Sequence, residues 1–305
     1  MITIGNFSFN LISMILYLVL APFVGGLLTG IDRKISARMQ GRFGPPVLQP
    51  FYDVLKLFEK EKITVNDAQD FYVGCGLVFM ILTGCLFFAG TSLLLVIFSL
   101  TIACLFIVIA AFSSNSPFSQ VGAERELLQI MSYEPMVLIA AVGFYLISGN
   151  SFSIIDITTS SNLGIIYLPG IFLGFLFILT IKFRKSPFDL STSHHAHQEL
   201  VKGLTTEFSG STLAFFEIMH WYENIMLLGF IFLFFANGST PMIVVGVFVC
   251  LAAYVLEVFI DNVNARMKWQ FTLKSSWIVA LTFGAVNMLV VYVAQIYYSK
   301  LGGVF

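Results

Sequence analysis

The residues best suited to proton or ion chemistry gather in one segment, residues 183–210, which reads FRKSPFDLSTSHHAHQELVKGLTTEFSG. Histidine changes charge between about pH 5 and pH 8, and a desolvated carboxylic acid titrates closer to neutrality than an exposed one. Groups of both types, joined by water, are what the movement of protons across part of a membrane requires. The segment supplies carboxylates, imidazoles and cations, namely Asp189, Glu199, Glu207, His194, His195, His197, Arg184, Lys185 and Lys202, with Lys182 directly before it.

Further ionisable residues lie inside the long apolar runs that flank this segment. An ionised group in hydrocarbon costs at least about 2.5 kcal/mol, so intramembrane carboxylates normally face protein or water. Glu134 opens one apolar run before Pro135, which fits a first helical turn, and Glu257 and Asp261 are four residues apart in another. Four residues at spacings of three, four and seven share one helical face, namely Glu217, His220, Trp221 and Asn224.

These carboxylates predict an ion path that runs from the charged segment through Glu134, Glu217 and Glu257. Two other acids, Glu223 and Asp261, are expected near the membrane interfaces, where solvation or pairing with nearby cations explains them as well as a function does. The three histidines could ligate a metal, but they lack a supporting cysteine, so a polar loop or a titrating relay is the favoured interpretation.

Composition excludes an ordinary soluble domain, because 58% of the residues are hydrophobic, only 11% are charged and the mean hydropathy is +0.90. Lipid must therefore be the solvent. The formal net charge of −1 gives no reason to expect nucleic acid. All four cysteines lie in apolar runs without a CxxC pair, so we expect no metal site, iron–sulfur cluster or other cofactor in this chain.

The apolar runs predict an all-α membrane protein with eight transmembrane helices, since about 20 apolar residues cross the hydrocarbon core. The expected spans lie near residues 11–31, 71–90, 93–113, 133–149, 164–182, 212–236, 240–260 and 277–298. With eight spans, fifteen of the 16 Lys and Arg residues fall on one side. The positive-inside rule makes that side cytoplasmic and places both termini outside. No Lys or Arg precedes Arg33, so the first run is expected to be a permanent span rather than a signal peptide.

Residues 48–60 predict a separate amphipathic helix on the cytoplasmic surface. Phe51, Val54, Leu55 and Phe58 recur at i, i+3, i+4 and i+7, and Pro50 suits the first helical turn. The helix is too short to span, which favours a position in the membrane surface over a plain linker. The preceding GRFGPP (41–46) predicts a tight turn.

Several motifs together resemble a known family. They are GRFGPPVLQPFYDVLKLFEKE (41–61), SYEP (132–135), SPFDL (186–190), ELVKGLTTEFSG (199–210) and NARMKW (264–269). In combination they resemble the membrane subunit that respiratory complex I shares with membrane-bound [NiFe] hydrogenases, in the family of complex I subunit 1. Within that group the 186–210 segment is most similar to the large membrane subunit of energy-converting (Ech-type) hydrogenases.

The resemblance implies a non-redox coupling subunit of a membrane-bound oxidoreductase in the cytoplasmic membrane of a bacterium or archaeon. Its implied partners are the hydrogenase small and large subunits, which would carry [4Fe–4S] clusters and a NiFe centre, an antiporter-like membrane subunit, and ferredoxin. Glu199 and Glu207 match acids of the family's cytoplasmic loop, Glu134 matches the acid of its Tyr-Glu element, and Asp189 that of Pro-Phe-Asp. Arg42 matches the arginine of the first-loop turn, and with Arg184 and Lys185 it is expected to contact the soluble arm.

Two departures from the complex I pattern disfavour quinone binding. The stretch from Gly44 to Pro50 lacks the second Gly-Pro of the quinone-reducing relatives, and Ser191, Thr192 and Ser193 stand where those relatives carry acids. Three alternatives stay open: a quinone- or phenazine-reducing complex I-like enzyme, a passive membrane scaffold, and a stand-alone transporter, which is disfavoured because no internal repeat is visible.

Overall fold

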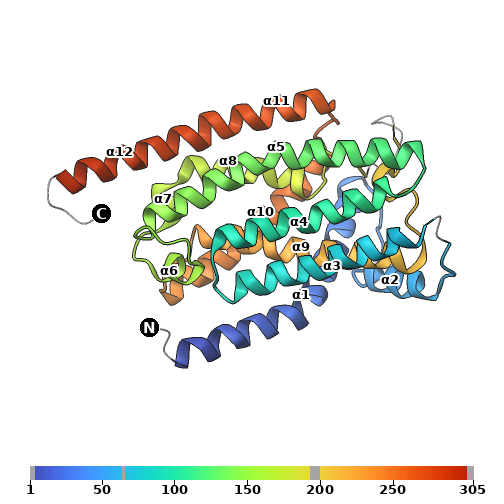
Figure 1. The fold of residues 1–305 in the computed structure, drawn as a ribbon, viewed down its shortest axis with the longest axis horizontal. Coiled ribbons are helices and arrows are strands. Elements are labelled where there is room, and N and C mark those ends of the chain that lie inside the picture. Colours follow the sequence, from blue (N-terminus) through green and yellow to red (C-terminus); the bar gives the residue numbers. More distant parts are fainter. Residues whose placement is uncertain (1–3, 64–65, 193–199, 301–305) are drawn as a thin grey trace.

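The computed structural model describes residues 4–63, 66–192 and 200–300, and these form a bundle of helices that run back and forth along one axis (Figure 1). The beginning of α1 and the end of α12 lie at the same end of the bundle, with α6 and α7, whereas α2 lies at the opposite end. The elements in chain order are α1 (Ile4–Met39), α2 (Gln49–Glu59), α3 (Asp67–Phe88), α4 (Leu93–Phe112), α5 (Pro117–Ile147), α6 (Ile154–Thr159), α7 (Gly164–Tyr167), α8 (Pro169–Lys182), the 3₁₀ turn η2 (Gly203–Thr205), α9 (Gly210–Leu233), α10 (Thr240–Val263), α11 (Trp269–Val279), the π-helical segment η3 (Ala280–Ala285) and α12 (Val286–Lys300).

Six helices in the described part of the chain are long and apolar enough to cross a membrane. They are α1, α3, α4, α5, α10 and the continuous helix formed by α11, η3 and α12. The protein is therefore an all-helical, multi-pass membrane protein. Because α8 has only 14 residues and α9 is not among the six, the eight spans expected from the sequence are not confirmed.

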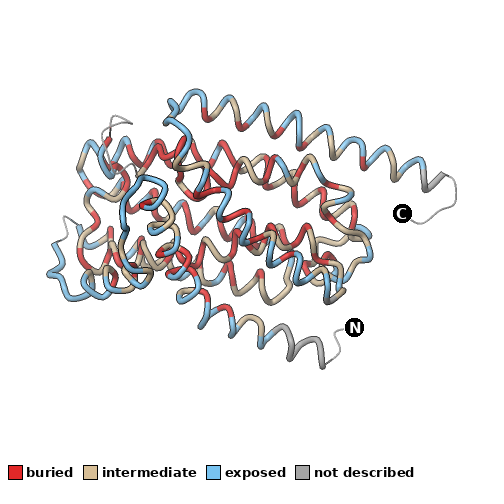
Figure 2. Tube along the Cα trace, turned by 180° about the vertical axis from the view of Figure 1, so that it is seen from behind, coloured by how far each residue is buried: buried red, intermediate tan, exposed pale blue. Residues whose placement is uncertain are grey.

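Packing is densest around α4, α5 and α9 at the centre of the bundle. Many residues of these three helices are buried, and Figure 2 shows the buried residues concentrated in the interior of the bundle. The long C-terminal helix from α11 to α12 is exposed over most of its length. Aromatic rings fill the centre. The ring centres of Phe144 and Phe234 are 4.7 Å apart, and those of Phe175 and Phe230 are 5.8 Å apart. Since lipid tails are as apolar as these side chains, helix association depends on this close packing rather than on the exclusion of water.

The helix α2 spans Gln49–Glu59, within the segment that the sequence pattern indicates. Pro50 lies in its first turn, and Val54 is buried against Ala214 and Trp221 of α9. The Phe51 ring lies 5.1 Å from that of Trp221. Leu55 stays exposed, as in a helix that turns apolar side chains towards lipid headgroups and acyl chains. Phe58 is also exposed in part, but its ring packs edge-on against that of Phe215 on α9, with 5.7 Å between the ring centres.

The helix α5 is longer than the sequence pattern indicates, because it begins at Pro117 and continues through Pro135 to Ile147. Pro135 is therefore an interior residue of the helix, and not the first-turn residue that we expected. Transmembrane helices tolerate such prolines where neighbouring elements satisfy the freed backbone groups. The consequence is that Arg125 and Glu126, which the sequence placed in a connection, share one helix with Glu134.

Candidate functional site

The site begins with a buried ion pair between α5 and the segment that follows α8. Arg184 donates hydrogen bonds from Nη2 and Nε to Oε1 of Glu126, at 2.6 and 3.2 Å. Ser191 Oγ donates to the other carboxylate oxygen at 2.5 Å. Only 7% of the Arg184 side chain and 6% of the Glu126 side chain are exposed, so each charge depends on the other for its solvation.

The same arginine contacts His220 of α9, and this contact determines where the imidazole carries its proton. Arg184 Nη1 lies 2.8 Å from His220 Nε2, and His220 Nδ1 lies 3.1 Å from Oε2 of Glu223. A guanidinium has only donors and a carboxylate only acceptors. Nε2 must therefore accept from Arg184, and Nδ1 must donate to Glu223, which makes His220 neutral with its hydrogen on Nδ1.

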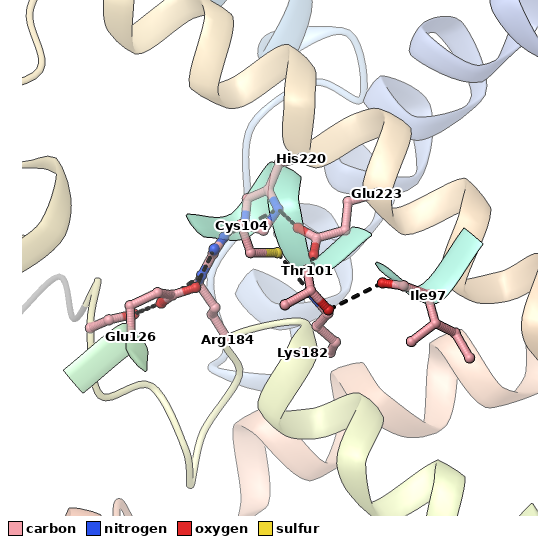
Figure 3. A network of polar contacts seen from close by, with 9 residues as sticks. Ile97, Thr101, Cys104, Glu126, Lys182, Arg184, His220 and Glu223 are labelled. Atoms are coloured by element: carbon pink, nitrogen blue, oxygen red, sulfur yellow. Dashed lines mark hydrogen bonds and ion pairs between the residues drawn. The ribbon is translucent and has the colours of Figure 1, made fainter. Parts of the chain in front are cut away.

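Glu223 continues the chain to a buried lysine at the end of α8. Lys182 Nζ donates to Glu223 Oε1 at 2.8 Å and to Cys104 Sγ of α4 at 3.1 Å, and it lies 4.5 Å from the centre of the Tyr133 ring. The exposed fractions are 5% for the Lys182 side chain and 2% for that of Glu223. Figure 3 shows these side chains turned towards one another from α4, α5, α9 and the end of α8.

Thr101, one turn before Cys104 on α4, contacts Glu134, which is the last acid of the site. Its hydroxyl lies 3.2 Å from Oε1 of Glu134 and 3.1 Å from the Ile97 carbonyl oxygen. Glu134 is half-buried on α5, two turns beyond Glu126. We call the continuous contacts from Glu126 through Arg184, His220, Glu223 and Lys182 to Cys104 the buried charge chain.

A polar cavity of about 250 Å³ adjoins the buried charge chain at Arg184 and His220. Its walls carry two further ion pairs: Lys185 with Asp32 at 2.5 Å, and Arg266 with Asp189 at 3.1 Å. Burial alone would lower the pKa of the Arg184 guanidinium, but the charges of Glu126 and Glu223 outweigh burial and raise that pKa above its ordinary value. Arg184 therefore stays positively charged at its position between the cavity and the interior.

Comparison with known proteins places these contacts in a family. The sequence profile of the NADH dehydrogenase family matches residues 11–292. This chain belongs to the NADH dehydrogenase family of membrane subunits, that of complex I subunit 1. It is 28% identical to the corresponding subunit of the NADH-quinone oxidoreductase of Geobacillus kaustophilus, over 95% of this chain and 94% of that one.

Other relatives in the complex I subunit 1 family come from complexes with different names. The chain is 33% identical to a subunit of the F(420)H(2) dehydrogenase of Methanosarcina mazei over 72% of this chain and 71% of that one. It is 28% identical to hydrogenase-4 component C of Escherichia coli over 88% of this chain and 91% of that one. The fold matches a chain of the membrane-bound sulfane sulfur reductase, an archaeal respiratory membrane complex, with a TM-score of 0.82 and 26% identity, over 92% of this chain and 99% of that one.

The predicted site residues that the structure describes do not all lie together. Glu217, His220, Trp221 and Asn224 all line the polar cavity, as their shared helical face predicts. Asp189 also lines it. Glu207 is partly buried after η2. His194, His195, His197 and Glu199 lie outside the described residues.

Glu257 differs from these acids because it is completely buried in α10. Among the residues that the structure describes, neither of its carboxylate oxygens has a hydrogen-bond partner. It lies on the same helical side as Tyr254 and Asp261, which line the polar cavity. The predicted place of Glu257 in an ion path stays a prediction.

The residues expected to contact a soluble partner also separate. Arg42 is exposed and bonded to Gln40, so a partner can reach it. Arg184 and Lys185 are buried in ion pairs, so their expected contact with the soluble arm stays a prediction.

Sequence reasoning did not select Glu126, Lys182, Cys104 or Glu223 for the site. Lys182 ends the apolar run 164–182, and Glu223 interrupts the apolar run 212–236. Opposite charges in two such runs indicate a buried ion pair. Glu126 was not selected because it stands in the charged cluster Glu124-Arg125-Glu126, which is typical of a polar connection between spans. Only a search for helical periodicity over residues 117–132 could have indicated that these residues are helical.

Proposed function

We propose that this chain is the membrane anchor and coupling subunit of an energy-converting [NiFe] hydrogenase complex in the cytoplasmic membrane. It links ferredoxin-dependent hydrogen evolution, or the reverse, to the translocation of H⁺ or Na⁺. Its partners are the hydrogenase small and large subunits, which hold the [4Fe–4S] clusters and NiFe centre, and an antiporter-like membrane subunit. The observation that carries this proposal is the buried charge chain between the polar cavity and α4.

The geometry of His220 supports a relay in which Arg184 acts as a gate. Nε2 is occupied by the guanidinium, so the imidazole can take a second proton only after Arg184 moves away. A proton from the cavity would then bind at Nε2, and the proton on Nδ1 would pass to Glu223. That transfer neutralises Glu223 and so weakens its ion pair with Lys182. Because Lys182 also contacts Cys104, the change in charge alters the electrostatic surroundings of α4. A charge arriving on the cytoplasmic partner would bias Arg184 by electrostatics.

The exit of the path is proposed to lie at Glu134. Its contact with Thr101 connects α5 to α4 one turn from Cys104, and its half-buried position leaves it accessible from the side of the bundle. A neighbouring membrane subunit packed there would receive the ion. We also propose that α8 and α9 cross the membrane, because both run through the centre of the bundle beside α4 and α5 (Figure 1), which completes eight crossings with both termini outside.

Two features of the first loop and of the segment after α8 favour a hydrogenase over a quinone reductase. The shortened segment from Gly44 to Pro50 and the serines and threonine at 191–193 remove features of the quinone-reducing relatives. The similarity to hydrogenase-4 component C extends over most of both chains and supports the same assignment.

A quinone-reducing complex is the second candidate, because the NADH-quinone oxidoreductase relatives also match nearly the whole chain. It predicts quinone in organic extracts of the purified complex and inhibition by quinone-site ligands.

The test is to purify the chain with its native partners, measure nickel, and assay hydrogen production from reduced ferredoxin. Nickel and ferredoxin-dependent hydrogen are the expected results. A complex without nickel that reduces quinone would overturn the proposal in favour of the second candidate. In the same complex, Glu207→Gln should leave hydrogen evolution from artificial donors intact and abolish ferredoxin-driven ion uptake in vesicles.

A further inference from the structure

A second cavity is lined in part by residues of α6, which lies at the opposite end of the bundle from α2 (Figure 1), and it shares no lining residue with the polar cavity. It has a volume of about 360 Å³ and lies where α3 and α9 end and α10 begins. Its walls are formed largely by apolar side chains, among them Phe87, Phe88, Ile154, Leu233 and Ile243. The buried charge chain makes no use of this cavity.

The hydroxyl groups in the wall are already engaged with the protein backbone. Ser13 Oγ donates to the Phe88 carbonyl oxygen at 2.7 Å. Thr158 and Thr159 donate to the Ile155 carbonyl oxygen at 3.0 and 2.8 Å. Because their hydrogens are donated to the backbone, these hydroxyls offer a guest no free hydrogen. Cavities with walls of this type stay dry or take apolar guests, and one of about 150 Å³ suffices for benzene.

The connections around the cavity carry no cation that could hold an anionic headgroup. No Lys or Arg occurs at residues 89–92, 148–153, 160–163 and 234–239. The acid at this end, Asp156, accepts a hydrogen bond from Ser151 at 2.5 Å. Recognition must therefore depend on the apolar part of the guest.

The opening of the cavity is continuous with side chains that face lipid. Ile243 in the wall is 44% exposed, and Ile12 and Leu16, which flank Ser13 along α1, are 60% and 55% exposed. A lipid beside α1 and α10 can thus place its tail in the cavity without crossing a polar surface.

We propose that this cavity is a binding site for one acyl chain of a membrane phospholipid, with no selection for the headgroup. The chain fills the space between the ends of α3 and α9 and the start of α10, and so stabilises this end of the bundle. The ring of an isoprenoid quinone is less well suited to the cavity, because the engaged hydroxyls leave its carbonyl oxygens without donors.

Photolabelling of the purified complex tests the site. The probes are phosphatidylcholine and phosphatidylglycerol with a diazirine in one acyl chain, and a quinone analogue with a diazirine on its quinone ring. We expect both lipids to label cavity residues such as Phe87 and Ile154 equally, and the quinone analogue to leave them unlabelled. Labelling confined to the outer surface, labelling by the quinone analogue instead of the lipids, or a strong preference for phosphatidylglycerol would each overturn the proposal.

Two variants that fill the cavity make the test specific. Ala236→Phe and Thr158→Phe each place an aromatic ring in its wall, and each should abolish labelling there. Val247→Trp is the matched control, because Val247 is 52% exposed on α10 and is not part of the cavity wall. Added phosphatidylcholine should raise the unfolding temperature of the delipidated wild type and of the control, but not of the filled variants. An equal rise in all of them would contradict an acyl-chain site in this cavity.

Discussion

Arg184 and Glu126 form a bidentate pair in which two guanidinium nitrogens contact the carboxylate, the shortest distance being 2.6 Å. The pair joins the segment after α8 to the beginning of α5. It also fixes the guanidinium beside His220, since Nη1 is the nitrogen left for the imidazole. The position of the gate in the buried charge chain therefore depends on Glu126, which holds the guanidinium from the side opposite His220.

Glu126→Gln should destabilise the protein strongly, because it removes the carboxylate that is directly hydrogen-bonded to the buried charge of Arg184. Breaking a buried pair in this way costs about 3–5 kcal/mol. The midpoint of unfolding in mild detergent measures the loss. Glu124→Gln is the matched control, since Glu124 is exposed two residues away on α5 and a surface change stays within about 0.5 kcal/mol. Equal midpoints for the two variants would show that the pair contributes nothing.

Gly122→Ala should detach the turn at η2 from α5. A Cβ atom at this position would lie 2.3 Å from the Leu204 nitrogen and 2.5 Å from the Gly203 carbonyl carbon, and neither backbone atom can move without moving the turn. We expect faster protease cleavage near Leu204 and weaker coupling. Gly74→Ala on α3 is the control, because its Cβ would meet nothing within 4 Å. Unchanged cleavage in Gly122→Ala would contradict this packing.

The attachment of α2 should depend on pH through Asp53. Burial favours the neutral acid, but hydrogen bonds from Arg33 and Gln49 outweigh burial and lower the pKa of Asp53 below its ordinary value. A lowered pKa means that the stabilisation is complete above the unfolded-state pKa of about 3.9 and disappears as the pH falls through the lower folded-state pKa.

Hydrogen exchange over Gln49–Glu59, corrected for the intrinsic exchange rate at each pH, measures this dependence, and a loss of protection is expected in the acid range. In Asp53→Asn the protection factor should not change over this acid range. A pH dependence that survives in Asp53→Asn would assign the effect to another group.

The helical class and the approximate positions of most helices follow from hydrophobic runs, because lipid leaves few other ways to satisfy a backbone. The same reasoning failed at α5. A polar sequence such as Glu124-Arg125-Glu126 reads as a connection when its partners are unknown, and only the tertiary contact with Arg184 shows why a helix can carry it there.

The candidate site was predictable in kind but not in detail. The face formed by Glu217, His220, Trp221 and Asn224 follows from helical periodicity, and the structure places it on the polar cavity. The pairing of Lys182 with Glu223 joins residues 41 positions apart, and their spacing carries no local signal for it. Nor could periodicity show that Arg184, which the sequence suggested for a docking surface, turns inward.

The passive-scaffold alternative and the relay differ most clearly at the pair of Lys182 and Glu223. In the double variant Lys182→Met, Glu223→Gln both charges are removed together, so no uncompensated buried charge remains. The glutamine oxygen can still accept from His220 Nδ1. The protein should therefore fold and assemble, and the hydrogenase reaction with artificial electron donors should continue.

Ferredoxin-driven ion uptake by vesicles that contain this double variant is the most direct measurement. The matched control removes the exposed pair of Arg33 and Asp53, whose side chains are each 39% exposed, as Arg33→Gln, Asp53→Asn. The relay predicts that uptake is lost in the Lys182→Met, Glu223→Gln variant and kept in the control. Uptake at the wild-type rate in that variant, with the complex intact, would contradict the relay and leave the buried charge chain a purely structural feature.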